Sequence, residues 1–130
     1  MGLFKKKTRY DLLENWLNAV FKNEPLDGVS ALAFNLYGDE KDRWSLDVVG
    51  TSSFDEDDTD WACDEITTFR TREKPFAWEE SAEWETVFAE TTALLRNYLA
   101  TGKYADKLKR VDGIGAGFVD GDLELLYVKQ

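Results

Sequence analysis

The chain has 130 residues, of which 43% are hydrophobic and 14% aromatic, and it carries 26 Asp and Glu against 16 Lys and Arg, for a formal net charge of -10. This length fits one domain with a packed core, so a disordered chain is excluded. Affinity for nucleic acids comes mainly from Lys and Arg side chains that displace counterions, so we expect no nucleic-acid partner for so acidic a chain.

The positive charge is concentrated at one end of the chain. Four residues within 1–9 are basic, namely Lys5, Lys6, Lys7 and Arg9. Because terminal segments are poorly ordered unless they are tied down, we interpret 1–9 as a flexible, solvated part of a single domain that spans 1–130. No apolar run is long enough for a signal peptide or a membrane span, so we expect a cytoplasmic protein with no membrane partner.

The first predicted element is a helix. Apolar residues recur at helical spacing from Tyr10 to Phe21, which predicts an amphipathic helix with one buried face. Thr8 and Asp11 resemble a capping box at its start, and Pro25 follows its end.

Two strands follow this helix. Residues 29–37 and 44–50 alternate apolar with small or polar side chains, and the turn-forming residues 38–42 separate them, which predicts an antiparallel hairpin. Residues 62–69 end in the β-favouring run Ile66 to Phe69, which predicts a third strand.

The clearest element is a long helix over residues 81–101. Its predicted buried face consists of Trp84, Val87, Phe88, Thr91, Leu94, Leu95, Tyr98 and Leu99. Gly102 is a natural end for it. Residues 114–119 and 122–128 then flank Asp120-Gly121, which predicts a closing hairpin. We therefore expect an α+β fold in which an antiparallel sheet is covered by the long helix and the N-terminal helix.

The chain contains no histidine and one cysteine. Nucleophilic mechanisms that need an imidazole base are therefore excluded, as are the common zinc and iron sites that need His. Cys63 cannot form an intramolecular disulfide, and beside Trp61 and several acids we interpret it as a packed core residue. Carboxylate chemistry stays open, either as a hydrolase with paired acids or as a Mg²⁺ or Ca²⁺ site.

Three glycines form a second feature. Gly113, Gly115 and Gly117 occupy alternate positions, so they share one face of a predicted strand. The spacing is not that of a dinucleotide-binding fingerprint, and a hairpin follows where that fingerprint needs a helix. We interpret this glycine strip as a place where a helix or a bulky aromatic side chain approaches the sheet closely, or as the mark of a bulge. A peptide or small ligand lying on the strip is the alternative.

The candidate site is an acidic loop. Its acidic residues are Asp55, Glu56, Asp57, Asp58 and Asp60. Phe54 and Trp61 stand at its ends and can anchor it on the domain, and an anchored anionic loop presents a fixed field that steers basic partners. A purely solvated loop is the alternative. The loop lacks the glycine of a tight calcium-binding turn, so we expect no metal and no cofactor.

Three segments carry a resemblance to known proteins. They are WSLDVVG (44–50), FDEDDTDWACDE (54–65) and GIGAGFVDGDLELLY (113–127). They resemble small acidic uncharacterised bacterial proteins, including some of the immunity type found beside polymorphic toxins. The resemblance spans 29–128 and implies a cytosolic, non-enzymatic protein that binds and blocks a toxin domain, with no binding residue that can be carried over.

The sequence therefore favours a non-enzymatic interaction module that binds a basic protein partner. The five acids of the loop would supply charge complementarity, and Trp61 would be an aromatic anchor for the partner. One alternative is a carboxylate-based hydrolytic enzyme, which a deep pocket with two convergent carboxylates of raised pKa would favour. Another is a regulatory domain that holds a small ligand against the glycine strip.

Overall fold

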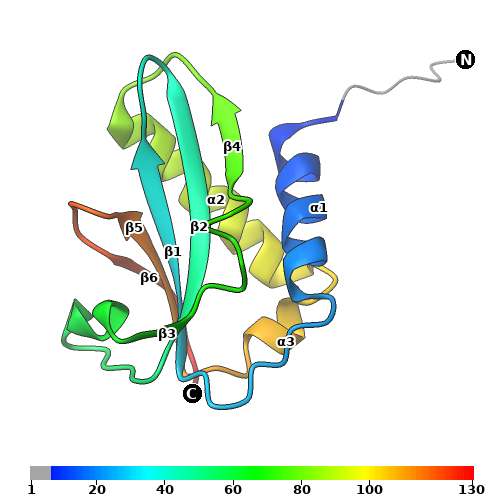
Figure 1. Cartoon of the computed structure of the whole chain (residues 1–130), viewed down its shortest axis with the longest axis vertical. Coiled ribbons are helices and arrows are strands. Elements are labelled where there is room, and N and C mark those ends of the chain that lie inside the picture. Colours follow the sequence, from blue (N-terminus) through cyan, green and yellow to red (C-terminus); the bar gives the residue numbers. More distant parts are fainter. Residues whose placement is uncertain (1–6) are drawn as a thin grey trace, which may run out of the picture.

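The computed structural model describes residues 7–130, and over this range the chain forms one α+β domain. Figure 1 views the sheet from the side opposite to its longest helix. The elements and their bounds, in chain order, are α1 (Arg9–Phe21), β1 (Ala31–Gly38), β2 (Arg43–Thr51), the 3-10 helix η1 (Thr59–Cys63), β3 (Glu65–Thr67), β4 (Phe76–Glu79), α2 (Trp84–Thr101), α3 (Ala105–Leu108), β5 (Gly113–Phe118) and β6 (Glu124–Val128).

The capping box at the start of α1 is confirmed. The Thr8 hydroxyl accepts a hydrogen bond from the backbone N–H of Asp11 at 3.1 Å, and the Asp11 carboxylate accepts one from the N–H of Thr8 at 3.0 Å. This cap starts the helix at Arg9, so the interpretation of 1–9 as a solvated segment is wrong for Arg9. For residues 1–6 that interpretation lies outside the described residues.

The sheet has the strand order β3-β2-β1-β5-β6, and β4 pairs with the opposite end of β2 from β3. Both predicted hairpins are confirmed, as β1 with β2 and β5 with β6, but residues 119–123 connect β5 to β6 where a two-residue turn at Asp120-Gly121 was predicted. The sheet is antiparallel except for the pair β1 and β5. Parallel neighbours need a crossover connection, and here α2 and α3 lie in the chain between β4 and β5.

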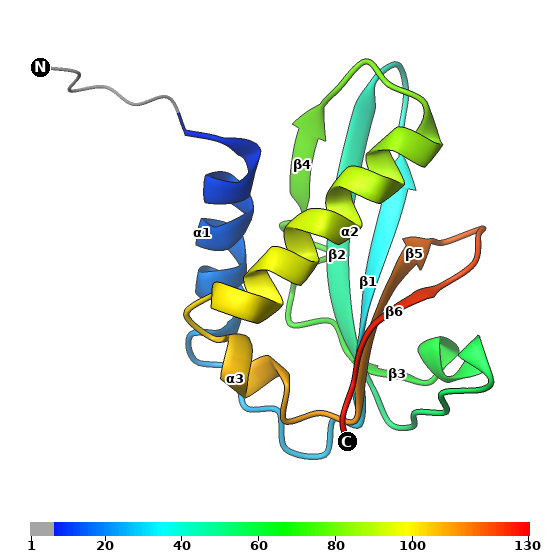
Figure 2. The ribbon, with the colours of Figure 1, turned by 180° about the vertical axis from the view of Figure 1, so that it is seen from behind.

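One face of the sheet carries the main core. Alternate residues of β1, namely Leu32, Phe34 and Leu36, are fully buried against helical residues such as Leu17 of α1 and Leu95 of α2. Each such side chain contributes roughly 1.5–3 kcal/mol through its burial. Figure 2 shows α2 lying diagonally across this face with α1 beside it, so the predicted cover of two helices is confirmed. No helix within residues 7–130 has the length and apolar character to cross a membrane.

The start of α2 differs from the prediction. The helix begins at Trp84 instead of residue 81, and the Trp84 side chain is 56% exposed, so its assignment to the buried face is wrong. Its ring lies edge-on to Phe118 at the end of β5, at 6.0 Å between centroids, and this contact leaves most of the ring in solvent.

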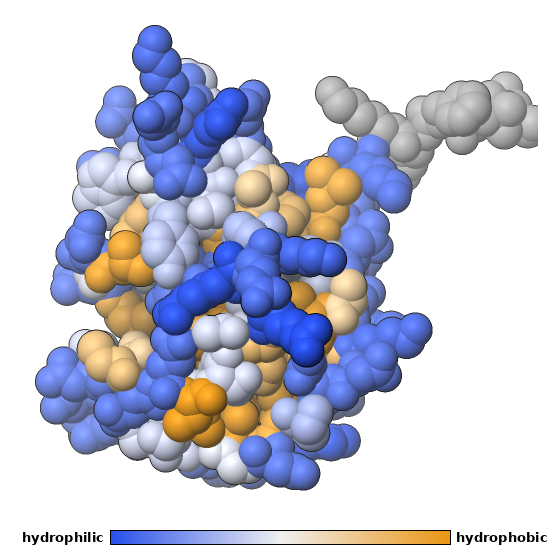
Figure 3. Space-filling view, in the orientation of Figure 1, coloured by the Kyte–Doolittle hydropathy of each residue, from blue (hydrophilic) through white to orange (hydrophobic). Residues whose placement is uncertain are grey.

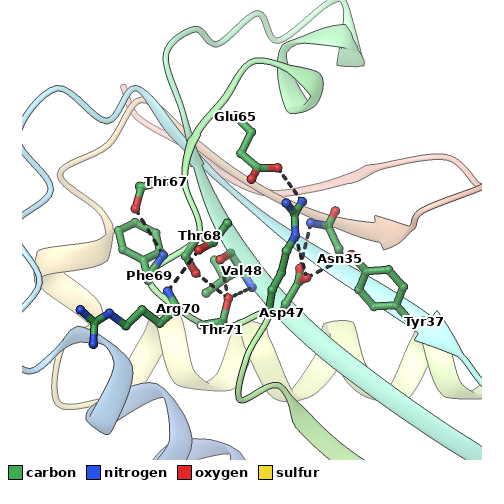
Figure 4. Close-up of polar contacts among 11 residues, drawn as sticks. Asn35, Tyr37, Asp47, Val48, Glu65, Thr67, Thr68, Phe69, Arg70 and Thr71 are labelled. Carbon is green, nitrogen blue, oxygen red and sulfur yellow. Dashed lines mark hydrogen bonds and ion pairs between the residues drawn. The ribbon is translucent and has the colours of Figure 1, made fainter.

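The segment after the acidic loop is also less regular than predicted. Only Glu65–Thr67 of the predicted strand 62–69 pairs with β2, because Phe69 and Arg70 adopt left-handed backbone angles, with φ of 50° and 62°, and turn the chain away. Between β3 and β4 the hydroxyl of Thr71 takes the place of a strand neighbour. It accepts from the Val48 N–H at 3.0 Å and donates to the Val48 carbonyl at 2.8 Å (Figure 4).

Candidate functional site

The acidic loop folds around its own carboxylates. Asp55 Oδ1 accepts a hydrogen bond from the N–H of Asp57 at 2.9 Å, and Asp58 Oδ1 accepts one from the N–H of Asp60 at 3.0 Å, which starts η1. These are local Asx turns of the kind that fix the path of a loop. All five acidic side chains, those of Glu56 included, are exposed. Their charges therefore stand on a defined backbone and face solvent.

Two aromatic residues anchor this loop. Phe54 and Trp61 meet edge to face, with ring centroids 5.2 Å apart, and they pack on the second face of the sheet against Ala31 and Ala33. The N–H of Ser52 also donates to the carbonyl of Asp64 at 2.9 Å and closes the base of the loop. Aromatic pairs of this kind contribute about 0.5–1.5 kcal/mol beyond the area they bury. The predicted anchoring of the loop on the domain is thus present.

Trp61 does not lie at the surface of the loop. It is 3% exposed, so the indole cannot contact a partner while the loop keeps this position. The burial of Trp61 therefore does not support the expectation that it anchors the partner. Its Nε1–H is buried without a hydrogen-bond acceptor in the described part of the chain. Trp61 instead holds the five acids in place from beneath.

The glycine strip is filled by the chain itself. A Cβ atom at Gly113 would overlap the Phe54 ring, and one at Gly115 would lie 2.8 Å from a methyl carbon of Leu123. One at Gly117 would lie 2.6 Å from the carbonyl oxygen of Asp122. Close approach of an aromatic side chain is confirmed at Gly113, and the register of β5 with β6 shifts between Ile114 and Gly115, as at a bulge. The side of the strip that a ligand would need is occupied by the chain itself.

Cys63 is a further correction. The side chain is exposed and not packed in the core. It follows Trp61 by two residues in η1, and a tight 3-10 turn that directs residue 61 inward directs residue 63 outward.

A buried polar cluster on the open face of the sheet was not predicted. Asp47, 2% exposed, accepts hydrogen bonds from Asn35 Nδ2 at 2.9 Å and from the hydroxyl of Tyr37 at 3.0 Å. Arg72 forms an ion pair with Asp47 at 3.7 Å and another with Glu65 at 2.6 Å (Figure 4). A carboxylate in the middle of the apolar strand 44–50 was the signal in the sequence that could have found this cluster.

The cluster around Asp47 has a structural role. Burial raises the pKa of the Tyr37 phenol, and the charge of Asp47 and the hydrogen bond to it act in the same direction, so Tyr37 stays protonated as a donor. Asp47 has three partners, which leaves little capacity for an external ligand. The cluster ties β1 and β2 to the segment that carries Arg72.

Two carboxylates do converge elsewhere, at the junction of α1 and α2. Arg9 bridges Glu80 at 2.7 Å and Glu90 at 3.1 Å, and Trp78 Nε1 donates to Glu80 at 3.1 Å. Burial acts to raise the pKa of Glu80, but hydrogen bonds with Glu90 and Trp78 and the charge of Arg9 outweigh it and hold that pKa below its usual range. The hydrogen bond with Glu80 raises the pKa of Glu90.

This pair does not form the site expected of a hydrolase. Only Glu90 has a raised pKa, both acids are paired with Arg9, and neither acid lines the hollow at residues 40–43 or the groove at the start of α2. Within residues 7–130 no group of three or more Cys, Asp or Glu side chains is placed to hold a metal ion. The pair instead holds α1 against α2.

The sequence also gave no indication of an aromatic groove at the start of α2. Its volume is about 850 Å³, and we define it by four aromatic and three acidic lining residues: Trp44, Trp84, Phe88, Phe118, Glu85, Asp120 and Asp122. Phe118 is its centre, in ring contact with Trp44 at 6.0 Å and with Phe88 at 6.3 Å between centroids. Spacing alone could not find it, because its rings come from three separate elements, β2, α2 and β5.

The groove and the acidic loop lie on the same side of the molecule. Figures 1 and 2 both place η1, the β5–β6 turn and the first turn of α2 along one side. Leu123, which follows the turn, packs in the same cluster as Phe54 and Trp61. In Figure 3 the part of this side that carries the loop is predominantly hydrophilic. Comparisons of the chain with models of protein families, with curated proteins and with solved structures find no match.

Proposed function

We propose that the chain is a non-enzymatic interaction module that binds a basic protein partner through its acidic loop. One observation carries the proposal: Asp55, Glu56, Asp57, Asp58 and Asp60 are exposed on a loop anchored by the buried Trp61 at one end and the half-buried Phe54 at the other. Charges held in place lose little conformational entropy on binding and present a constant field to an approaching partner. A partner of the toxin-domain type fits the sequence resemblance.

A reducing compartment fits the same proposal. Cys63 is exposed, and an exposed thiol is prone to oxidation or mixed disulfides in an oxidising compartment. We therefore place the interaction in the cytoplasm. The hydrolase alternative is less favoured, because only one of the two converging carboxylates has a raised pKa and both are paired with Arg9.

The test replaces the charges of the loop without changing its shape. In the loop variant, Asp55, Asp57, Asp58 and Asp60 become Asn, whose side-chain oxygen can still accept the hydrogen bonds of the two Asx turns. A matched control removes four exposed acids away from the loop: Asp27→Asn, Glu73→Gln, Asp106→Asn and Asp112→Asn. Both variants carry a net charge of -6, since four charges are removed from -10.

Each chain is then used as bait in an extract of the cells that produce it. The expected result is a basic protein that wild type and control retain in stoichiometric amount, that salt elutes, and that the loop variant loses. Loss from both variants to the same degree would mean that total charge matters and the loop does not, and the proposal would fail.

A further inference from the structure

The rings of the aromatic groove are held in fixed orientations before any ligand arrives. Trp44 Nε1 donates to the carbonyl of Glu80 at 2.9 Å, and Gly38 lets the Trp44 ring lie against the backbone, since a Cβ there would come within 3.0 Å of it. Trp84 meets Phe118 at an interplanar angle of 89°. The groove is therefore preorganised, which reduces the entropy cost of binding.

The exposure of Trp84 has no evident structural purpose. Its side chain is 56% exposed at the first position of α2, where a polar residue would serve the helix equally well. Exposed tryptophan is enriched at binding surfaces, because its large rigid ring contributes contact area at little cost in entropy.

The charges around the groove select what can enter it. Glu85, Asp120 and Asp122 line it, and no Lys or Arg of the described chain does. Aromatic faces attract cations, and the carboxylates at the rim add to this attraction. A purely apolar ligand would gain nothing from the carboxylates and would partly desolvate them.

From these observations we infer that the aromatic groove is a binding site for an arginine side chain, presented by the basic partner. The inference rests on the proposed function for the source of the arginine, but the chemistry of the groove does not depend on the acidic loop. Arginine fits better than lysine because its planar guanidinium stacks on aromatic faces, is weakly hydrated and donates two parallel hydrogen bonds to a carboxylate.

The experiment uses a defined probe and needs no identified partner. The blocked tripeptide Gly-Arg-Gly is titrated into the full chain, and the indole N–H resonances of Trp44 and Trp84 are followed by NMR. The control peptide carries citrulline, which has the shape of arginine without its charge, and a second one carries lysine. We expect both indole resonances to shift with the arginine peptide, with a dissociation constant on the order of millimolar, and to shift little with citrulline.

Two substitutions at one exposed position separate the cation–aromatic attraction from plain contact area. Trp84→Leu keeps an apolar side chain and should weaken binding about threefold to fivefold, whereas Trp84→Phe keeps an aromatic face and should weaken it less. The rim variant Glu85→Gln, Asp120→Asn, Asp122→Asn should weaken binding more than Asp27→Asn, Asp106→Asn, Asp112→Asn, which removes the same charge elsewhere. Thermal unfolding of each variant confirms that it is folded.

Several results would overturn the inference. They are equal binding of the citrulline peptide, equal or tighter binding of the lysine peptide, no change with Trp84→Leu, or shifts confined to residues outside the groove. The two proposals can fail separately. The proposed function is tested by binding of the partner to the loop variant. The groove is tested by binding of the tripeptide, which the loop variant should bind like wild type. Once the partner is in hand, Trp84→Leu should speed its dissociation, and an unchanged dissociation rate would overturn the assignment of the arginine to that partner.

Discussion

The ring of Phe54 occupies the space that a side chain on Gly113 would need. This contact joins the acidic loop to the sheet, so the position of the loop depends on a residue more than fifty positions away in the sequence. A mutation at Gly113 should therefore act on the loop and on stability together.

Gly113→Ala should destabilise the domain by about 1–3 kcal/mol, because the added methyl group overpacks the site and displaces Phe54. Urea unfolding measures the change. Gly121→Ala is the matched control, since the nearest atom to a Cβ there is 3.6 Å away, and it should change stability by less than about 0.5 kcal/mol. Equal effects of the two substitutions would contradict the account of how the loop is anchored.

The first residue of α2 and a core residue within it should respond differently to side-chain truncation. Leu95 is 1% exposed within the main core, so Leu95→Ala should cost about 2–5 kcal/mol. Trp84→Ala should cost less than about 1 kcal/mol, because more than half of that side chain is already in water. Denaturant midpoints of the two variants decide the matter, and a loss at Trp84 as large as that at Leu95 would mean that the ring is buried in solution.

The Tyr37 phenol should titrate later than an ordinary tyrosine. Its pKa is raised above 10 by burial and by the charge and hydrogen bond of Asp47, so the stability that it contributes is complete below pH 10 and is lost as pH rises through the folded-state pKa. Asp47→Asn should lower the pKa of Tyr37, but the increase in this pKa that burial causes should remain. The ultraviolet absorbance of tyrosinate during alkaline titration measures this, with Asp39→Asn as the control that should leave it unchanged.

Removing the carboxyl group of Glu90 should make the free energy of unfolding depend less on pH between pH 4.5 and pH 7. The folded-state pKa of Glu90 is raised, so its favourable contribution is present below its unfolded pKa, near 4.5, and is lost as pH rises through the raised value. The folded-state pKa of Glu80 is lowered, so its contribution has the opposite sign and is lost as pH falls below about 4.5. Glu90→Gln should therefore lose less stability than wild type between pH 4.5 and pH 7, as measured by urea unfolding. If the free energies of unfolding of wild type and Glu90→Gln differ by the same amount at every pH, the claim that the fold raises the pKa of Glu90 is contradicted.

Much of the fold follows from local patterns in the sequence. The capping box of Thr8 and Asp11 starts α1, and Asp120-Gly121 turns between the last two strands, because both signals depend only on neighbouring residues. The strand β4 is only four residues long and directly follows Pro75, so periodicity could not reveal it.

The remaining differences depend on contacts between distant segments. A helical stripe shows which side of α2 is apolar but not how far along the helix that side is covered, so the exposure of Trp84 could not be predicted. The partners of Asp47 come from β1 and from the segment around Arg72, and only the folded chain brings them together. The five acids of the loop were found because a run of charge is visible in the sequence, whereas the burial of Trp61 beneath them was not. The expected absence of metal and cofactor stays a prediction.

The association rate of the basic partner with the loop variant, measured by stopped flow at low and at high salt, tests the central claim most directly. Steering by fixed charges raises association rates and is screened by salt. At low salt we expect the loop variant to associate roughly tenfold or more slowly than the charge-matched control, with a shallower salt dependence, and the three chains to converge at high salt. Equal rates and equal salt dependence for the loop variant and the control would contradict the claim that the acidic loop is the recognition surface.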